Sequence, residues 1–99
     1  MRRLLLAILL LIGLLPLPAA ARTLLVVGDS LSAAYGMDVN SGWVALLRQR
    51  LEREKLDYQV VNASISGDTT ANGRARLPRL LAEYQPAIVL IELGGNDGL

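Results

Sequence analysis

Residues 24–30 read Leu-Leu-Val-Val-Gly-Asp-Ser, and this stretch decides the fold. Four consecutive apolar residues, two of them β-branched, run directly into a turn of glycine, aspartate and serine. A continuous apolar run, unlike an alternating one, indicates a strand that is buried on both faces, as in a parallel sheet. We therefore predict a strand of such a sheet at Leu24 to Val27.

Two further runs of the same kind follow, Tyr58 to Val61 and Ile88 to Leu93. Between the three runs lie two amphipathic patterns with helical spacing. The first begins after Ser41, a candidate N-cap, and the second covers about Thr70 to Tyr84. The core-facing stripe of the first helix would comprise Trp43, Leu46, Leu47 and Leu51, and that of the second Leu77, Leu80, Leu81 and Tyr84.

Two prolines limit the second helix. Pro78 should kink it or split it in two, and Pro86 prevents its continuation. The resulting order is strand, helix, strand, helix, strand, which predicts an α/β fold with a parallel sheet and right-handed crossovers. Ligands of such sheets bind beyond the carboxyl ends of the strands. The turns that follow the three strands are therefore the candidate site.

All three turns contain glycine and polar side chains. They are Gly-Asp-Ser-Leu-Ser at 28–32, Asn-Ala-Ser-Ile-Ser-Gly-Asp-Thr at 62–69 and Gly-Gly-Asn-Asp-Gly at 94–98. Together they offer a hydroxyl, backbone N–H groups and a carboxamide, the groups that acyl transfer requires. Each turn alone is weak evidence, because turn chemistry and helix capping, with Thr69 or Thr70 as an N-cap, are the more common explanation. Their coincidence at successive strand ends favours the functional interpretation.

The three turns resemble the sequence blocks of the SGNH (GDSL-like) hydrolase family. Residues 28–32 are similar to the first block, Gly67 matches the glycine of the second, and residues 94–97 match the Gly-x-Asn-Asp of the third. The likeness covers essentially all of residues 23–99 and is strongest to the bacterial secreted branch of thioesterases, arylesterases and lysophospholipases. It implies a three-layer α/β/α sandwich, the flavodoxin-like SGNH fold, of which this chain holds the first β-α-β-α-β portion.

The resemblance also implies a mechanism. Ser30 would attack the acyl carbonyl of an ester or thioester, and the oxyanion hole would comprise the N–H groups of Ser30 and Gly67 and the side-chain amide of Asn96. Glycine at 67 lets a backbone donor approach the substrate without a Cβ atom, and the Asn96 amide can donate while neutral. No cofactor and no metal ion are implied. The expected partner is a small acyl ester, a thioester or a lysophospholipid.

Three aspartates of the turns, Asp29, Asp68 and Asp97, are interpreted as loop-bracing residues, because a carboxylate would repel a developing oxyanion.

The sequence lacks the general base that a serine nucleophile needs. In the family this base is a histidine of an Asp-x-x-His block, and the chain contains no histidine. Lys55, on the polar face of the first helix, is no obvious substitute. We therefore expect residues 22–99 to be the N-terminal part of a longer hydrolase domain. Alone, they should fold poorly and hydrolyse esters no better than a Ser30→Ala variant.

Residues 1–21 have the composition of a cleavable signal peptide: a basic start, the apolar run Leu4 to Leu15, two prolines and three alanines. Cleavage before Arg22 would make the protein periplasmic or secreted, without a stable membrane anchor. The remaining eight Lys and Arg residues face nine Asp and Glu residues, so the net charge is about −1 and offers no basic patch for nucleic acid. The absence of cysteine excludes disulfides and lipoprotein anchoring.

Three other interpretations stay open. The chain could be a pseudo-enzyme that binds acyl ligands without catalysis, or a membrane-associated domain that keeps its leader as an anchor. A glycine turn after the first strand also suits a phosphate- or nucleotide-binding module. Against the last interpretation, Gly28-Asp29-Ser30 is neither Gly-x-Gly-x-x-Gly nor a Walker loop, and Asp29 would repel phosphate.

Overall fold

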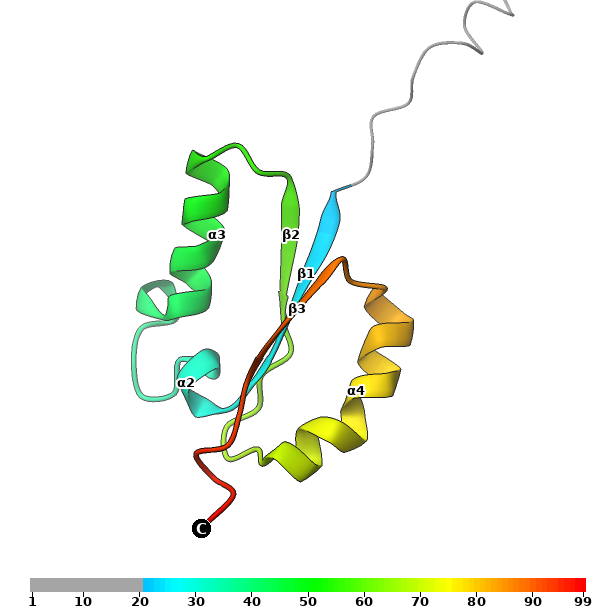
Figure 1. The fold of residues 1–99 in the computed structure, drawn as a ribbon. Helices are drawn as coiled ribbons and strands as arrows, with labels where there is room; N and C mark the ends of the chain where they lie inside the picture. Colours follow the sequence, from blue (N-terminus) through cyan, green and yellow to red (C-terminus); the bar gives the residue numbers. More distant parts are fainter. Residues whose placement is uncertain (1–20) are drawn as a thin grey trace, which may run out of the picture.

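The structure is a computed structural model, and it describes residues 21–99. Three strands form one parallel sheet in the order β2-β1-β3 (Figure 1). Their bounds are Arg22–Gly28 for β1, Tyr58–Asn62 for β2 and Ile88–Glu92 for β3. The helices are α2 (Ser30–Ala33), α3 (Trp43–Arg53) and α4 (Thr70–Tyr84), with a short 3-10 helix η1 (Val39–Ser41) before α3.

The strand order places the two crossover helices on opposite faces of the sheet. The chain moves from β1 to β2 in one direction and from β2 to β3 in the other, and both crossovers of a parallel sheet are expected to be right-handed. Figure 1 shows α3 on one side of the sheet and α4 on the other. This arrangement confirms the predicted α/β fold with a parallel sheet between helical layers.

The core is centred on β1, which lies between its two partners. Residues 24–29 are all buried, and Leu25, Val26 and Val27 are the largest fully buried side chains of the described chain. On the α3 face, Leu24 and Val26 pack with Val44 of α3. Partly buried side chains surround this cluster: Trp43, Leu47, Leu51, Tyr58 and Val60.

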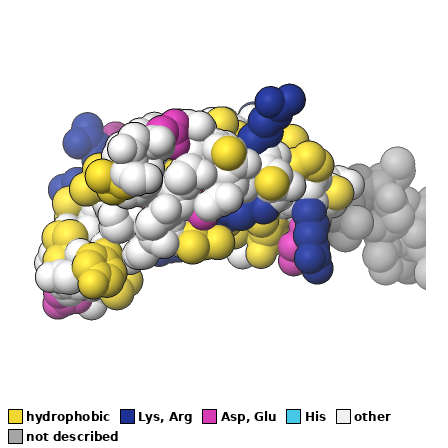
Figure 2. Space-filling view, turned by 90° about the horizontal axis from the view of Figure 1, so that it is seen from below, with side chains coloured by type: hydrophobic (Ala, Val, Ile, Leu, Met, Phe, Trp, Pro, Cys, Tyr) yellow, Lys and Arg dark blue, Asp and Glu magenta, His cyan; other side chains and the backbone are white. Residues whose placement is uncertain are grey.

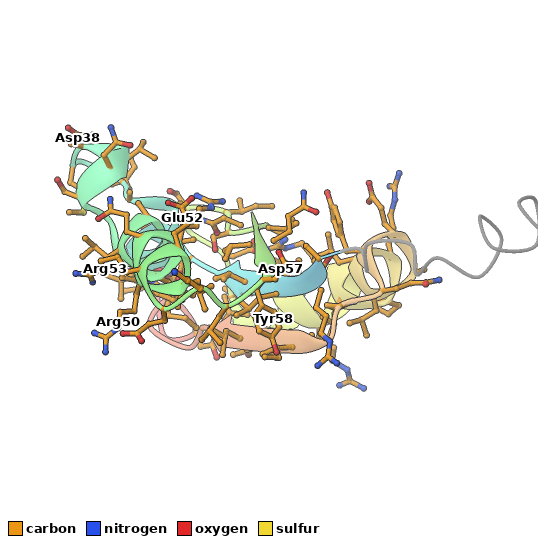
Figure 3. The ribbon with its side chains drawn as sticks, turned by 90° about the horizontal axis from the view of Figure 1, so that it is seen from above. Asp38, Arg50, Glu52, Arg53, Asp57 and Tyr58 are labelled. Carbon is orange, nitrogen blue, oxygen red and sulfur yellow. The ribbon has the colours of Figure 1, made fainter. Side chains whose placement is uncertain are left out.

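The polar side of α3 faces solvent, as its sequence pattern predicts. Arg50 and Arg53 point away from the sheet (Figure 3), and Arg50 forms an exposed i,i+4 ion pair with Glu54 at 3.0 Å. Two details of the prediction for this helix are wrong. Gly42, not Ser41, is the N-cap, because Ser41 is the last residue of η1. Leu46 is 52% exposed and does not belong to the core stripe.

Helix α4 has the predicted bounds, and Thr69 is its N-cap, accepting a hydrogen bond from Asn72 N at 3.1 Å. Pro78 does not split the helix, which continues through it and changes direction in Figure 1. The helix ends before Pro86 at the C-cap Gln85, whose φ of 42° is left-handed.

Burial on both faces holds for β1 only. β2 is half-buried, and three apolar residues of β3 are exposed within the described chain: Ile88, Leu90 and Ile91 at 37%, 36% and 61%. The prediction that all three strands are buried on both faces is therefore wrong for β2 and β3, the two edge strands, each of which has only β1 beside it in the sheet.

The signal peptide predicted for residues 1–21 lies almost wholly outside the described residues. Within residues 21–99, no helix is both long enough and apolar enough to cross a membrane.

Candidate active site

The first turn of the site presents Ser30 at the start of a short helix. Asp29 is the N-cap of α2, and its Oδ1 accepts a hydrogen bond from Leu31 N at 3.0 Å. This bond satisfies one of the N–H groups that the first turn of a helix leaves without a partner. Asp29 is buried and Ser30 is half-buried, so the hydroxyl of Ser30 sits at a rim between core and solvent.

A polar network beneath this turn fixes its position. Glu92, at the end of β3, accepts hydrogen bonds from Ser32 Oγ at 2.8 Å and from Asp29 N at 3.3 Å. Ser32 Oγ in turn accepts one from Trp43 Nε1 at 3.0 Å. Gly28 is needed here because a Cβ atom at this position would meet Ser32 Oγ at 2.5 Å and Glu92 Oε1 at 2.9 Å.

The second turn is tied to the first by backbone and side-chain bonds. Ile65 N donates to Gly28 O at 3.0 Å, and Asn62 Nδ2 donates to Ser32 O at 2.9 Å. These bonds hold the segment after β2 against the carboxyl end of β1 and the start of α2.

Gly67 occupies a position that favours glycine for its backbone conformation. Its φ is +84°, and Asp68 N donates to Ile65 O at 3.1 Å, the pattern of a type II turn with glycine in the third place. Nothing lies within 4 Å of a Cβ atom built at Gly67, so conformation rather than protein crowding accounts for the glycine. The residue is exposed.

The third turn brings the Asn96 side chain to both of the others. Asn96 Nδ2 donates to Asp68 O, next to Gly67, at 2.9 Å. The same nitrogen lies 3.4 Å from Asp29 Oδ2, next to Ser30. The carboxamide thus lies between Asp29 and Asp68. These residues are next to Ser30 and Gly67, whose backbone N–H groups are the other two predicted oxyanion donors.

Two of the three nominated donors are free. Among the hydrogen bonds of residues 21–99, none is donated by the N–H of Ser30 or of Gly67. Figure 2 looks at the molecule from the end where the strands finish, and this face is covered largely by backbone and uncharged polar side chains. An N–H group without a partner in the protein can donate to an oxygen that becomes negative, which is the kind of donor that an oxyanion hole requires.

The three aspartates interpreted as loop braces all make bracing contacts. Asp29 caps α2, and Asp68 Oδ2 accepts from Arg76 Nε at 2.7 Å. Asp97 accepts from both the N–H and the hydroxyl of Thr70, each at 2.8 Å. The backbone and then the side-chain bond from Thr70 lower the pKa of the Asp97 carboxyl, against a smaller opposing effect of burial.

Sequence reasoning missed the residues that support the site from behind: Ser32, Trp43, Arg76 and Glu92. One indication was available for Glu92, a single carboxylate inside the apolar run from Ile88 to Leu93. Such a residue in a predicted strand needs hydrogen-bond donors, because an unpaired buried charge is costly. The partners of Trp43 and Arg76 were not readable, since each contact joins a helix to a turn 8 to 13 residues earlier, and only the folded chain determines which atoms meet.

Known proteins place the chain in a family. Residues 26–99 match the GDSL-like Lipase/Acylhydrolase family. Over 99 residues the chain is 68% identical to "Esterase TesA" of Pseudomonas aeruginosa, and this alignment covers all of this chain and 49% of that protein. Over 81 residues it is 58% identical to "Thioesterase 1/protease 1/lysophospholipase L1" of Escherichia coli strain K12, covering 82% of this chain and 38% of that protein.

A solved structure agrees with these sequences. The crystal structure of TesA superimposes with a TM-score of 0.76 and 71% identity, covering 78% of this chain and 43% of that chain. The α/β fold, with polar turns at the carboxyl ends of its strands, is thus the fold that this chain shares with SGNH hydrolases. The chain is a member of the GDSL-like lipase/acylhydrolase family. It spans about half the length, or less, of the relatives that it matches.

Proposed function

We propose that these residues supply the nucleophile and the oxyanion hole of a serine hydrolase of acyl esters and thioesters. Ser30 Oγ attacks the acyl carbon, and the negative oxygen accepts hydrogen bonds from Ser30 N, Gly67 N and Asn96 Nδ2. A general base takes the hydroxyl proton of Ser30 during this attack, the bond from the acyl carbon to the leaving oxygen or sulfur then breaks, and the base returns the proton to the leaving alcohol or thiol. Water hydrolyses the acyl-enzyme and releases the acid.

The observation that carries this proposal is the double contact of Asn96. Its amide nitrogen lies 2.9 Å from Asp68 O and 3.4 Å from Asp29 Oδ2, beside Gly67 on one side and Ser30 on the other. The longer of these contacts is the weaker one, since hydrogen bonds of this type are normally 2.7–3.2 Å long. An oxyanion that enters between the turns would replace that contact and take over one N–H of the amide.

An acyl substrate is supported by the apolar side chains that follow the nucleophile. Four of them are exposed in the described chain: Leu31, Tyr35, Met37 and Val39. They offer the surface that an acyl chain needs and a phosphate does not. The names of the relatives, an esterase and a thioesterase with lysophospholipase, agree with this substrate class. The buried carboxylate of Asp29 opposes a phosphate- or nucleotide-binding function.

The general base comes from outside these 99 residues in this proposal. The sequence contains no histidine, while the relatives are about twice as long or longer.

We further propose that residues 1–21 are a cleaved signal peptide and that residues 22–99 act in the periplasm or outside the cell. The N-terminal residue of the mature protein, measured by mass spectrometry, tests this location. An intact leader would contradict it.

A fluorophosphonate probe tests the nucleophile. The protein is expressed from its complete reading frame, labelled, digested and analysed by mass spectrometry. We expect the label on Ser30, loss of labelling in Ser30→Ala, and unchanged labelling in Ser66→Ala, which alters an exposed serine of the second turn. A label on any other residue would overturn the assignment.

A second candidate, an acyl-binding protein without catalysis, is favoured by the missing histidine alone. The same experiment separates the two functions. If Ser30 remains unlabelled while the protein still binds a non-hydrolysable acyl thioether in calorimetry, the hydrolase proposal is wrong and the binding function stands.

A further inference from the structure

The second turn of the site is held in place by a side chain of α4. Gly67 is exposed, and within residues 21–99 its N–H donates no hydrogen bond that would fix its direction. A backbone donor on such a turn stabilises an oxyanion only if its direction is fixed before the reaction. The question is therefore what fixes residues 63–68 relative to the rest of the site.

Arg76, from the second turn of α4, contacts both ends of this segment. Its Nε donates to Asp68 Oδ2 at 2.7 Å, and its Nη1 donates to Ala63 O at 2.5 Å. The guanidinium plane is rigid, so the two bonds fix the separation and orientation of Ala63 and Asp68. Gly67 lies between these two anchor points.

The same contact reaches the third turn through Asp68. The Asp68 side chain receives the guanidinium, while the Asp68 backbone oxygen receives Asn96 Nδ2 at 2.9 Å. Any displacement of Asp68 thus moves the acceptor that orients the Asn96 amide. Two of the three proposed oxyanion donors, Gly67 N and Asn96 Nδ2, depend on one arginine.

The environment of Arg76 argues against a role in stability alone. Its side chain is 22% exposed, and that of Asp68 is 8% exposed. Desolvation of a partly buried ion pair offsets much of its Coulombic attraction. Within residues 21–99, Arg76 Nη2 is moreover buried without a hydrogen-bond partner. A side chain placed in this way contributes fixed geometry more than it contributes net stability.

We propose that Arg76 is a positioning residue of the oxyanion hole, which sets the direction of Gly67 N directly and that of Asn96 Nδ2 through Asp68. This inference rests on the proposed hydrolase function. A misplacement of about 1 Å can reduce a rate by about 100-fold, and deletion of a whole oxyanion donor reduces it by about 100- to 1000-fold. Loss of Arg76, which would misplace two donors without deleting either, should therefore reduce the rate by less than the deletion of a whole donor does.

Steady-state hydrolysis of p-nitrophenyl acetate by the protein from its complete reading frame tests the proposal. Arg76→Ala should lower kcat by about 10- to 100-fold and change KM by less than about 3-fold, since the interaction matters in the transition state. Arg76→Lys, which keeps the charge but cannot donate in two fixed directions, should still lose most of this activity. Arg79→Ala, an exposed arginine on the same helix, should retain full activity.

A double-mutant cycle separates positioning from general loosening of the fold. Because Arg76 acts partly through Asn96, Asn96→Ala and Arg76→Ala should be non-additive: Arg76→Ala should slow the Asn96→Ala variant by a smaller factor than it slows the unmodified protein, and the remaining loss reflects Gly67 N. Fully additive losses would contradict the positioning role, as would a kcat of Arg76→Lys equal to that of the unmodified protein.

The Ser30→Ala variant distinguishes the two proposals. If Ser30→Ala retains turnover, the hydrolase function assigned to this site fails, whatever Arg76 does. If Ser30→Ala is inactive while both Arg76 variants are fully active, only the inference on Arg76 fails. If Arg76→Ala does not fold, as judged by circular dichroism, the decision rests on Arg76→Lys, for which the same kinetic expectation holds.

Discussion

The carboxamide of Asn96 has two N–H hydrogens, and the structure gives both an acceptor, Asp68 O and Asp29 Oδ2. Before any substrate binds, these contacts keep the nitrogen directed toward the first two turns. Because one contact is long, it can be exchanged at little cost, whereas the bond to Asp68 O holds the amide in place. Asparagine suits this position because its amide nitrogen carries two donor hydrogens and no charge.

Glu92 is the residue whose loss should disturb the turn around Ser30 most directly. Glu92→Ala removes the acceptor of both Ser32 Oγ and Asp29 N. Unpaired polar groups in a partly buried site cost about 1 to 3 kcal/mol. The free energy of unfolding, measured in urea, should therefore fall by that amount. Glu83→Ala, an exposed change on α4, should stay within about 0.5 kcal/mol of the unmodified protein. An equal effect of both substitutions would contradict this account.

At the scale of elements, the start of α4 is clamped to the turn after β3. Thr69 caps the helix, and Thr70 gives its N–H and its hydroxyl to the Asp97 carboxylate. A carboxylate at a helix N-terminus also interacts favourably with the helix dipole. The clamp connects the second and third turns from the α4 side.

This clamp predicts a pH dependence. Because the pKa of Asp97 is lowered in the folded state, its carboxylate stabilises the fold above its ordinary pKa of about 3.9. That contribution disappears as the pH falls through the lower folded-state pKa. Thr70→Ala keeps the backbone donor and loses the hydroxyl, so the pKa should move upward, toward the ordinary value. A carboxyl-detected NMR titration measures it.

Asn72→Ala is the matched control for this titration, because Asn72 is an exposed side chain in the same helical turn. The control should leave the Asp97 titration where it is. An unchanged pKa in Thr70→Ala would show that the hydroxyl bond at 2.8 Å does not act on the carboxylate as described.

Helix boundaries were predictable to different degrees for physical reasons. Those of α4 follow from Thr69 and Pro86, whose effects on the backbone are local. The start of α3 was wrong by one residue because the preceding η1 uses Ser41 in its own last turn. Leu46 was assigned to the core by helical spacing, but the neighbouring elements determine which part of a helix is covered, and Leu46 remains 52% exposed.

At the scale of the whole molecule, β3 is an edge strand with exposed apolar side chains. Ile91 is 61% exposed, and Ile88 and Leu90 are also exposed. An apolar edge strand pairs readily with other chains. We expect residues 22–99, expressed alone, to self-associate in light scattering at micromolar concentrations.

Charge substitution checks the location of this association. Ile91→Lys should shift the protein toward the monomer, because a lysine on an edge strand opposes pairing. Leu46→Lys, an exposed change on α3, should leave the association unaltered. A monodisperse monomer with cooperative unfolding, or equal responses of the two variants, would contradict the expectation.

The sequence by itself determined the parallel α/β class, the two crossover helices, and the three turns that carry Ser30, Gly67 and Asn96. These features depend on local periodicity, capping and turn chemistry, which act over a few residues. Only the tertiary structure decided that Asn96 lies between Asp29 and Asp68, and that Glu92 and Arg76 hold the turns in place. Those contacts join residues 8 to 67 positions apart, and side chains from different elements meet only after the strand order and the helix positions have been fixed by burial of β1.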